Sequence, residues 1–223
     1  MTGSIWHLVA ALAVFLASHS LTNLKPFRER AIGLVGKGGF YGGYSVLSLL
    51  LLAWMILAYM DAPTVVVWEQ QPWMRWVPPV AMLLACLLGA AGLSSPNPFS
   101  IGPGGRGFDP ARPGIVRLTR HPVIWALALW AGAHAVPNGD VAALMLFVPL
   151  LGLALAGPRI LDTKRRGQLG EAEWRRLAEA AARPWRIGQL VGEVGAKRLL
   201  AGLAVYGALL MVHQPLIGVA PLP

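Results

Sequence analysis

The chain has 223 residues, of which 56% are hydrophobic and 13% are charged; soluble domains have roughly 25% charged residues. This balance excludes an ordinary soluble domain and indicates an integral membrane protein. The net charge of +9 could suggest a nucleic-acid partner, but the basic residues form short blocks between apolar runs, as membrane topology requires. We therefore expect contact with membrane lipid and no nucleic-acid binding.

Six apolar segments follow one another along the chain. They cover residues 4–24, 44–60, 77–93, 122–136, 141–157 and 199–217. A helix needs about 20 residues to cross a bilayer, and the fourth and fifth segments are short by that measure. The first segment carries no positive charge ahead of it, which favours an uncleaved helix over a signal peptide. We predict an all-α polytopic membrane bundle of about six transmembrane helices.

Basic residues are concentrated in every second loop. Four follow the first segment, four lie between the third and fourth, and ten lie between the fifth and sixth, whereas the alternate loops contain only Arg75. The positive-inside rule then predicts a multi-pass protein of the cell inner membrane with both termini on the non-cytoplasmic side.

Three pieces outside the apolar segments have recognisable patterns. The run Pro137-Asn138-Gly139-Asp140 predicts a tight turn between two helices. Residues 97–114 are too rich in Gly and Pro for a helix and predict a long cytoplasmic loop that folds over something. Residues 171–182 predict a short polar-faced helix, whose Trp174 places it at the membrane surface.

Histidines are the residues most able to carry chemistry within the membrane. His7, His19 and His134 fall inside apolar segments, where ionisable side chains are costly and usually functional. The structural alternative is a neutral histidine that is hydrogen-bonded between helices. The apolar segments contain no Asp, Glu or paired Cys, which disfavours a carboxylate metal cage or a proton relay. Two imidazoles from different helices suit haem b, with basic loops holding its propionates.

Arg120-His121-Pro122 predicts the start of a helix, because proline is well tolerated at the first helical position. The helix N-terminus together with Arg117 and Arg120 would form an anion site. The alternative is that the two arginines only anchor the end of the helix.

The stretch GIVRLTRHP, followed by an apolar run, Trp130, Ala133, His134 and Asn-Gly-Asp, resembles the NnrU family of bacterial membrane proteins. Ser18-His19-Ser20 in the first segment is also similar to that family. So is the tail, with Glu171, Glu173 and Trp174 followed by Arg183-Pro184-Trp185. The resemblance implies an NnrU-like membrane domain over residues 1–187 and a C-terminal extension over residues 188–223 with the sixth transmembrane helix.

NnrU proteins are associated with nitrite and nitric oxide metabolism in denitrification. The pattern also resembles the related 15-cis-zeta-carotene isomerase, a redox-gated enzyme that uses haem b. The resemblance implies a haem b cofactor with His19 and His134 as iron ligands, and a hydrophobic small-molecule substrate. Arg117, Arg120 and His121 are further candidates for cofactor binding at the helix start.

The identity of the second iron ligand stays open. At 1.5 Å per residue, His121 and His134 lie about 20 Å apart along their helix, which places His134 towards the outer side. His7 and His213 are predicted on that same side, whereas His19 is nearer the inner end of its helix. By depth, His7 or His213 would pair more naturally with His134, but the residue match with the isomerase keeps His19 as the predicted second ligand.

Two other function classes remain as alternatives. One is an S-adenosylmethionine-dependent membrane methyltransferase, since such enzymes of the isoprenylcysteine type also carry Arg-His-Pro at a helix start. The Tyr and Gly that usually follow are missing here, where residues 123–126 read VIWA. The other is a non-enzymatic membrane scaffold, which Gly- and Ala-rich helices would permit.

Overall fold

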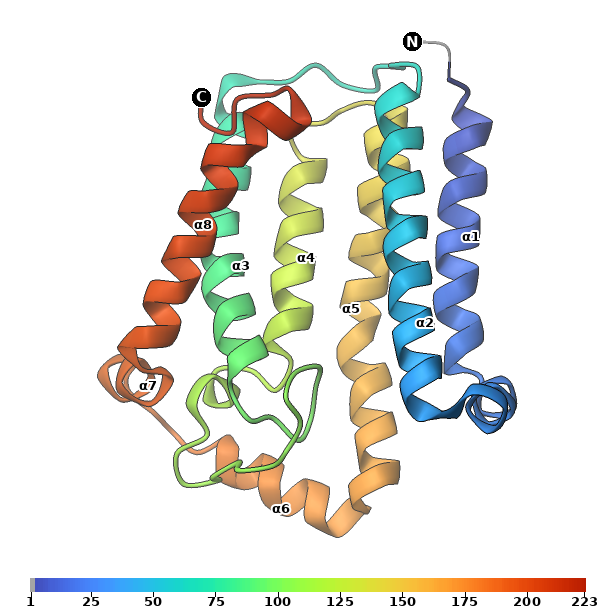
Figure 1. The fold of residues 1–223 in the computed structure, drawn as a ribbon. Coiled ribbons are helices and arrows are strands. Elements are labelled where there is room, and N and C mark those ends of the chain that lie inside the picture. The colour runs from blue at the N-terminus through green and yellow to red at the C-terminus, as the bar shows by residue number, and fades with distance from the viewer. Residues whose placement is uncertain (1–2) are drawn as a thin grey trace. The chain divides into compact units, whose positions relative to one another are not determined.

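A computed structural model describes residues 3–223 and shows an all-α protein (Figure 1). Its α-helices are α1 (Ile5–Asn23), α2 (Lys25–Asp61), α3 (Val77–Ser94), α4 (Pro122–Ala135), α5 (Val141–Leu169), α6 (Glu171–Ala181), α7 (Ile187–Val194) and α8 (Ala196–Ile217). Short 3₁₀ turns, η1 (Pro72–Trp76) and η2 (Gly114–Arg117), precede α3 and α4. The predicted all-α helix bundle is confirmed.

Within the described residues, five helices are long and apolar enough to span a membrane, namely α1, α2, α3, α5 and α8. Helix α4 is apolar but has only 14 residues. The six predicted segments therefore correspond to five long spans and one short helix. Helices α2 and α5 extend well beyond the predicted segments, because each continues into the neighbouring basic sequence.

Contacts divide the chain into two compact units. The first contains the residues up to Glu69 together with Gly139–Leu146, and the second contains Gln70–Asn138 and Phe147–Pro223. In the first unit, α1 and α2 form a hairpin. The Trp54 indole of α2 donates to His7 Nε2 of α1 at 2.8 Å. Gly36, at φ 72° and ψ 167°, interrupts the helical backbone of α2 after its basic first turns.

The predicted Asn-Gly-Asp turn is confirmed, and each residue has a separate structural role. Asn138 donates to the His134 carbonyl at 2.7 Å and so caps the end of α4. A side chain at Gly139 would collide with the backbone of Trp68. Asp140 accepts from the Ala143 amide at 2.9 Å and so caps the start of α5.

In the second unit, α3 packs between α4 and α8 (Figure 1). Small residues allow these helices to approach closely, as is common in membrane bundles. A Cβ at Gly92 would lie 2.8 Å from atoms of Pro122 and Val123 on α4. A Cβ at Gly202 of α8 would lie 2.9 Å from Leu87 Cα on α3.

Substitution of Gly202 by alanine is expected to lower the free energy of unfolding by about 1–3 kcal/mol, because the added methyl group meets backbone atoms that cannot move aside. Gly207 lies on the same helix with nothing within 4 Å of its Cβ position. Its alanine variant is the matched control and should be neutral or stabilised by up to ~1 kcal/mol. Denaturant unfolding in detergent micelles measures both, and equal stabilities would contradict the close α3–α8 contact.

The glycine- and proline-rich loop folds over α6, as its length predicted. Phe99 of the loop is fully buried and packs edge-on against Trp174 of α6, with ring centroids 6.0 Å apart. Val116, Leu177 and Ala181 complete this core. The apolar face of α6 is therefore covered by protein, whereas the sequence placed Trp174 at the membrane surface.

Candidate functional site

The Arg-His-Pro motif forms a cluster around Asp162 at the start of α4, in which His121 is buried and Arg120 and Asp162 are partly exposed. Arg120 donates to Asp162 Oδ2 at 2.9 Å, and His121 Nε2 donates to Asp162 Oδ1 at 2.9 Å. Asp162 comes from the part of α5 that continues beyond its apolar segment. The Asn97 amide donates to the Arg120 carbonyl at 2.9 Å and holds the loop against this helix start.

His121 is only 3% exposed, and its environment favours the neutral ring. Burial lowers the pKa of His121 below its ordinary value of 6.5, and the neighbouring Asp162 carboxylate only partly offsets this effect. The neutral imidazole donates from Nε2 to Asp162. Nδ1 then carries the lone pair, and it has no hydrogen-bond partner. The cluster thus contains a buried acceptor that is oriented by a carboxylate.

Arg117 forms a second ion pair at the same end of the second unit, and this pair is buried. It donates through Nε and a terminal nitrogen to both carboxylate oxygens of Glu193 on α7, at 3.0 and 2.8 Å. The side chains of Arg117 and Glu193 are 3% and 8% exposed. Hydrogen bonds from Arg117 hold the pKa of Glu193 below its ordinary value of 4.5. This bidentate pair ties α7 to η2.

Two arginine side chains lie over the ring of Trp174 on α6. The Arg166 guanidinium lies 4.0 Å from the Trp174 ring centroid and that of Arg120 lies 5.2 Å from it, both within cation–π range. Arg165 donates to the Ser100 carbonyl at 2.8 Å. These contacts fasten the loop and α6 to the polar end of α5.

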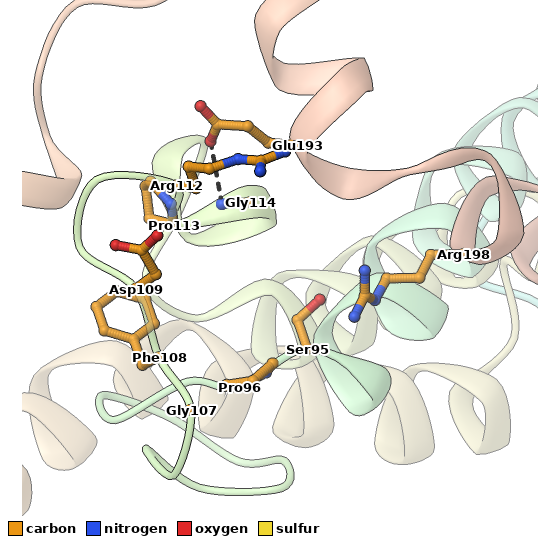
Figure 2. Close-up of a pocket in the computed structure, with 10 residues that line it drawn as sticks. All are labelled: Ser95, Pro96, Gly107, Phe108, Asp109, Arg112, Pro113, Gly114, Glu193 and Arg198. Carbon is orange, nitrogen blue, oxygen red and sulfur yellow. Dashed lines mark hydrogen bonds between the residues drawn. The ribbon is translucent and has the colours of Figure 1, made fainter.

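A small cavity opens beside the Arg117–Glu193 pair (Figure 2). Its volume is about 90 Å³, and its polar lining includes Ser95, Arg112, Glu193 and Arg198. The Gly114 amide donates to Glu193 across it at 3.2 Å (Figure 2). There is room for about three water molecules, whereas pockets for cofactor-sized ligands have volumes of roughly 300 Å³ or more.

A pair of histidines lies at the opposite end of α4 from His121. The imidazole of His134 and that of His213 on α8 have ring centroids 6.5 Å apart and planes inclined by 28°. His134 Nδ1 donates to the Trp130 carbonyl at 2.8 Å, and His213 Nδ1 donates to the Val219 carbonyl at 2.8 Å. Phe147 packs on the His134 ring, with the two ring centroids 5.5 Å apart.

The two remaining histidines belong to the first unit. His19 Nδ1 donates to the Phe15 carbonyl at 2.8 Å, and its ring lies against Phe15 and Tyr44. His7 differs because its Nε2 accepts from Trp54. Only His19 of these two has the Nδ1–carbonyl hydrogen bond that His134 and His213 also make.

Comparison with models of known protein families shows which family the chain is related to. The family model described as NnrU protein matches residues 7–221, nearly the whole chain. The chain belongs to the NnrU family. No curated protein and no solved structure matches it. The matched range includes α8, and the predicted division of this NnrU protein at residue 187 stays a prediction.

The predicted site residues of this NnrU protein fall into separate groups. Arg117, Arg120 and His121 lie together at the start of α4, where their contacts are with carboxylates of the chain itself. His134 lies about 20 Å further along the same helix, and His19 belongs to the other unit. Their assignment to cofactor binding stays a prediction.

Sequence analysis did not identify Asp162 and Glu193 as partners of these residues. They are 41 and 76 residues from His121 and Arg117, and no local motif marks them. The one feature of the sequence that could have pointed to them is their charge, since each is an acidic residue in a strongly basic stretch.

Proposed function

We propose that this NnrU protein binds haem b within the membrane, with His134 as an iron ligand. The observation that carries the proposal is the state of His134. Its Nδ1–H is held by the Trp130 carbonyl, which fixes the tautomer with the lone pair on Nε2. Metal-binding histidines are oriented by this kind of hydrogen bond.

The surroundings of His134 suit a porphyrin better than a bare metal ion. Among residues 3–223 no group of three or more His, Cys, Asp or Glu side chains could hold a metal. A protein site for Zn²⁺ needs three or four such ligands, whereas haem brings four nitrogen ligands and requires only axial ones. Leu127 stands seven residues before His134, on the same face of α4, and is exposed. It offers an apolar contact.

The chain's own residues then have distinct tasks. His134 would hold the iron, the Trp130 carbonyl orients the imidazole, and Phe147 packs against the ring. Haem bound there supplies an iron that changes oxidation state and binds a small ligand or polarises a double bond.

Family membership supports the activity that we propose. A haem of this type serves nitrite and nitric oxide metabolism, or a redox-gated cis–trans isomerisation of a hydrophobic molecule that enters from the bilayer. The basic loops favour a location in the inner membrane with both termini on the non-cytoplasmic side.

An absorption spectrum of the purified protein tests haem binding. The protein, expressed with haem supply and purified in detergent, is expected to show a Soret band and one haem per chain by the pyridine haemochrome assay. Oxidised and reduced spectra should differ, as a redox-active iron requires. A colourless preparation that has normal helicity and does not take up added haemin would refute the proposal.

A further inference from the structure

The geometry points to His213 of α8, and not His19, as the second axial ligand of the haem that His134 binds. This inference rests on the proposed function and identifies the ligand set of the same site. His134 and His213 belong to one unit of the structure. They come from α4 and α8, which both pack on α3.

The separation of the two rings agrees with one shared metal. An imidazole nitrogen lies about 2 Å from the metal it binds, so two nitrogens on opposite sides are about 4 Å apart, and the ring radii bring the centroids to about 6 Å. The observed centroid separation is 6.5 Å. Aromatic pairs in direct contact have ring centroids about 4.5–7 Å apart. The centroid separation of these two rings is therefore near the upper end of the range for rings in direct contact.

The hydrogen bonds of the two rings are alike and leave the same nitrogen for a metal. Each Nδ1 donates to a main-chain carbonyl, that of Trp130 for His134 and that of Val219 for His213. Each Nε2 therefore carries a lone pair. The Val219 carbonyl lies beyond the end of α8, so the C-terminal residues orient the His213 ring.

The tail that orients His213 is itself fastened to the second unit. Arg75 of η1 donates to the Leu222 carbonyl at 3.0 Å. This contact restrains the segment that carries Val219, and so helps to fix the direction of the imidazole. Such supporting contacts are what a metal ligand requires beyond its own nitrogen.

The face of α8 that carries His213 is apolar. Leu209 and Ile217 stand four residues before and after it, on the same side of the helix, and both are exposed. A porphyrin at the pair would contact these side chains in place of lipid. His19, by contrast, packs against Phe15 and Tyr44 in the other unit.

The test compares His213→Ala with the matched variant His19→Ala in haem-loaded protein, by absorption and electron paramagnetic resonance spectroscopy. The wild-type protein should show six-coordinate low-spin iron. His213→Ala is expected to give high-spin, five-coordinate iron, and added imidazole should restore the low-spin signal. His19→Ala should keep the low-spin spectrum. His213→Met provides a second check, because a thioether ligand should raise the midpoint potential.

The outcomes separate this inference from the proposed function. Low-spin iron in His213→Ala together with high-spin iron in His19→Ala would overturn the assignment and leave haem binding intact. Loss of haem from His213→Ala supports the assignment if imidazole restores binding, and overturns it if imidazole does not. A wild-type protein without haem would overturn the proposed function and this inference together.

Discussion

Replacing His134 with alanine is expected to remove the Soret band from the purified protein while its far-ultraviolet circular dichroism stays unchanged. The loss follows because alanine offers the iron no ligand, and His213, the ligand that remains, makes its orienting hydrogen bond at an exposed position, where we expect it to hold haem too weakly to survive purification. The helix should persist, since alanine is the best helix former. Pyridine haemochrome analysis of wild type and variant, purified side by side, measures the effect.

His7→Ala is the matched control. His7 also lies in an apolar helix, but its Nε2 accepts the hydrogen bond from Trp54, so we expect its removal to leave haem content unchanged. Imidazole supplied during reconstitution should partly restore haem binding to His134→Ala. If His134→Ala retained full haem content and an unchanged spectrum, His134 would not be an iron ligand.

The membrane-spanning helices of this protein are largely predictable from sequence. A long apolar segment in lipid must satisfy its backbone hydrogen bonds internally, and a helix does so. What the runs do not determine is where each helix ends in water. Helix α5 passes through Pro149 and Pro158 and continues to Leu169, although its apolar segment stops near Gly157. That extension matters, since it carries Asp162 to His121.

Helix α7 is not predictable by the same rule. It has eight residues and contains Gly188 and Gly192, which weaken its intrinsic helical preference. The helix is held by tertiary contacts: Val194 packs with Ala91 and Ile115, and Glu193 pairs with Arg117. Contacts between residues so distant in sequence have no local signature.

The sequence predicted which type of residue forms the candidate site, but not which second histidine lies beside His134. The cost of a histidine in lipid singled out His7, His19 and His134 from sequence alone, and the family resemblance then named His19 and His134 as iron ligands. The neighbour of His134 could not be derived in this way, because it depends on how α4 and α8 pack on α3. Helix depth had named His213 only as one of several choices, and its assignment depends on the 6.5 Å separation of its ring centroid from that of His134.

Glu193→Gln is expected to lower the free energy of unfolding by about 3–5 kcal/mol, because removal of one partner of a buried ion pair leaves the other charge uncompensated. Arg117 is 3% exposed and cannot turn to solvent. The new amide would also present a donor to Gly114 N–H or Gln189 Nε2–H, which now donate to the carboxylate. Denaturant unfolding in detergent measures the global effect, and hydrogen exchange in α7 measures its local release.

Glu173→Gln is the control, because Glu173 forms an ion pair with Arg176 on an exposed face of α6, where its side chain is 44% exposed. Such solvent-exposed pairs contribute little to stability, because water and salt screen the two charges. The two variants should also differ in pH dependence. The lowered pKa of Glu193 means that its stabilisation is complete above the ordinary value of 4.5 and is lost as the pH falls through the folded-state pKa. Wild-type protein and Glu173→Gln should therefore lose more stability than Glu193→Gln below about pH 4.5. Equal acid profiles and equal stabilities for the two variants would show that the Arg117–Glu193 pair does not hold α7 in place.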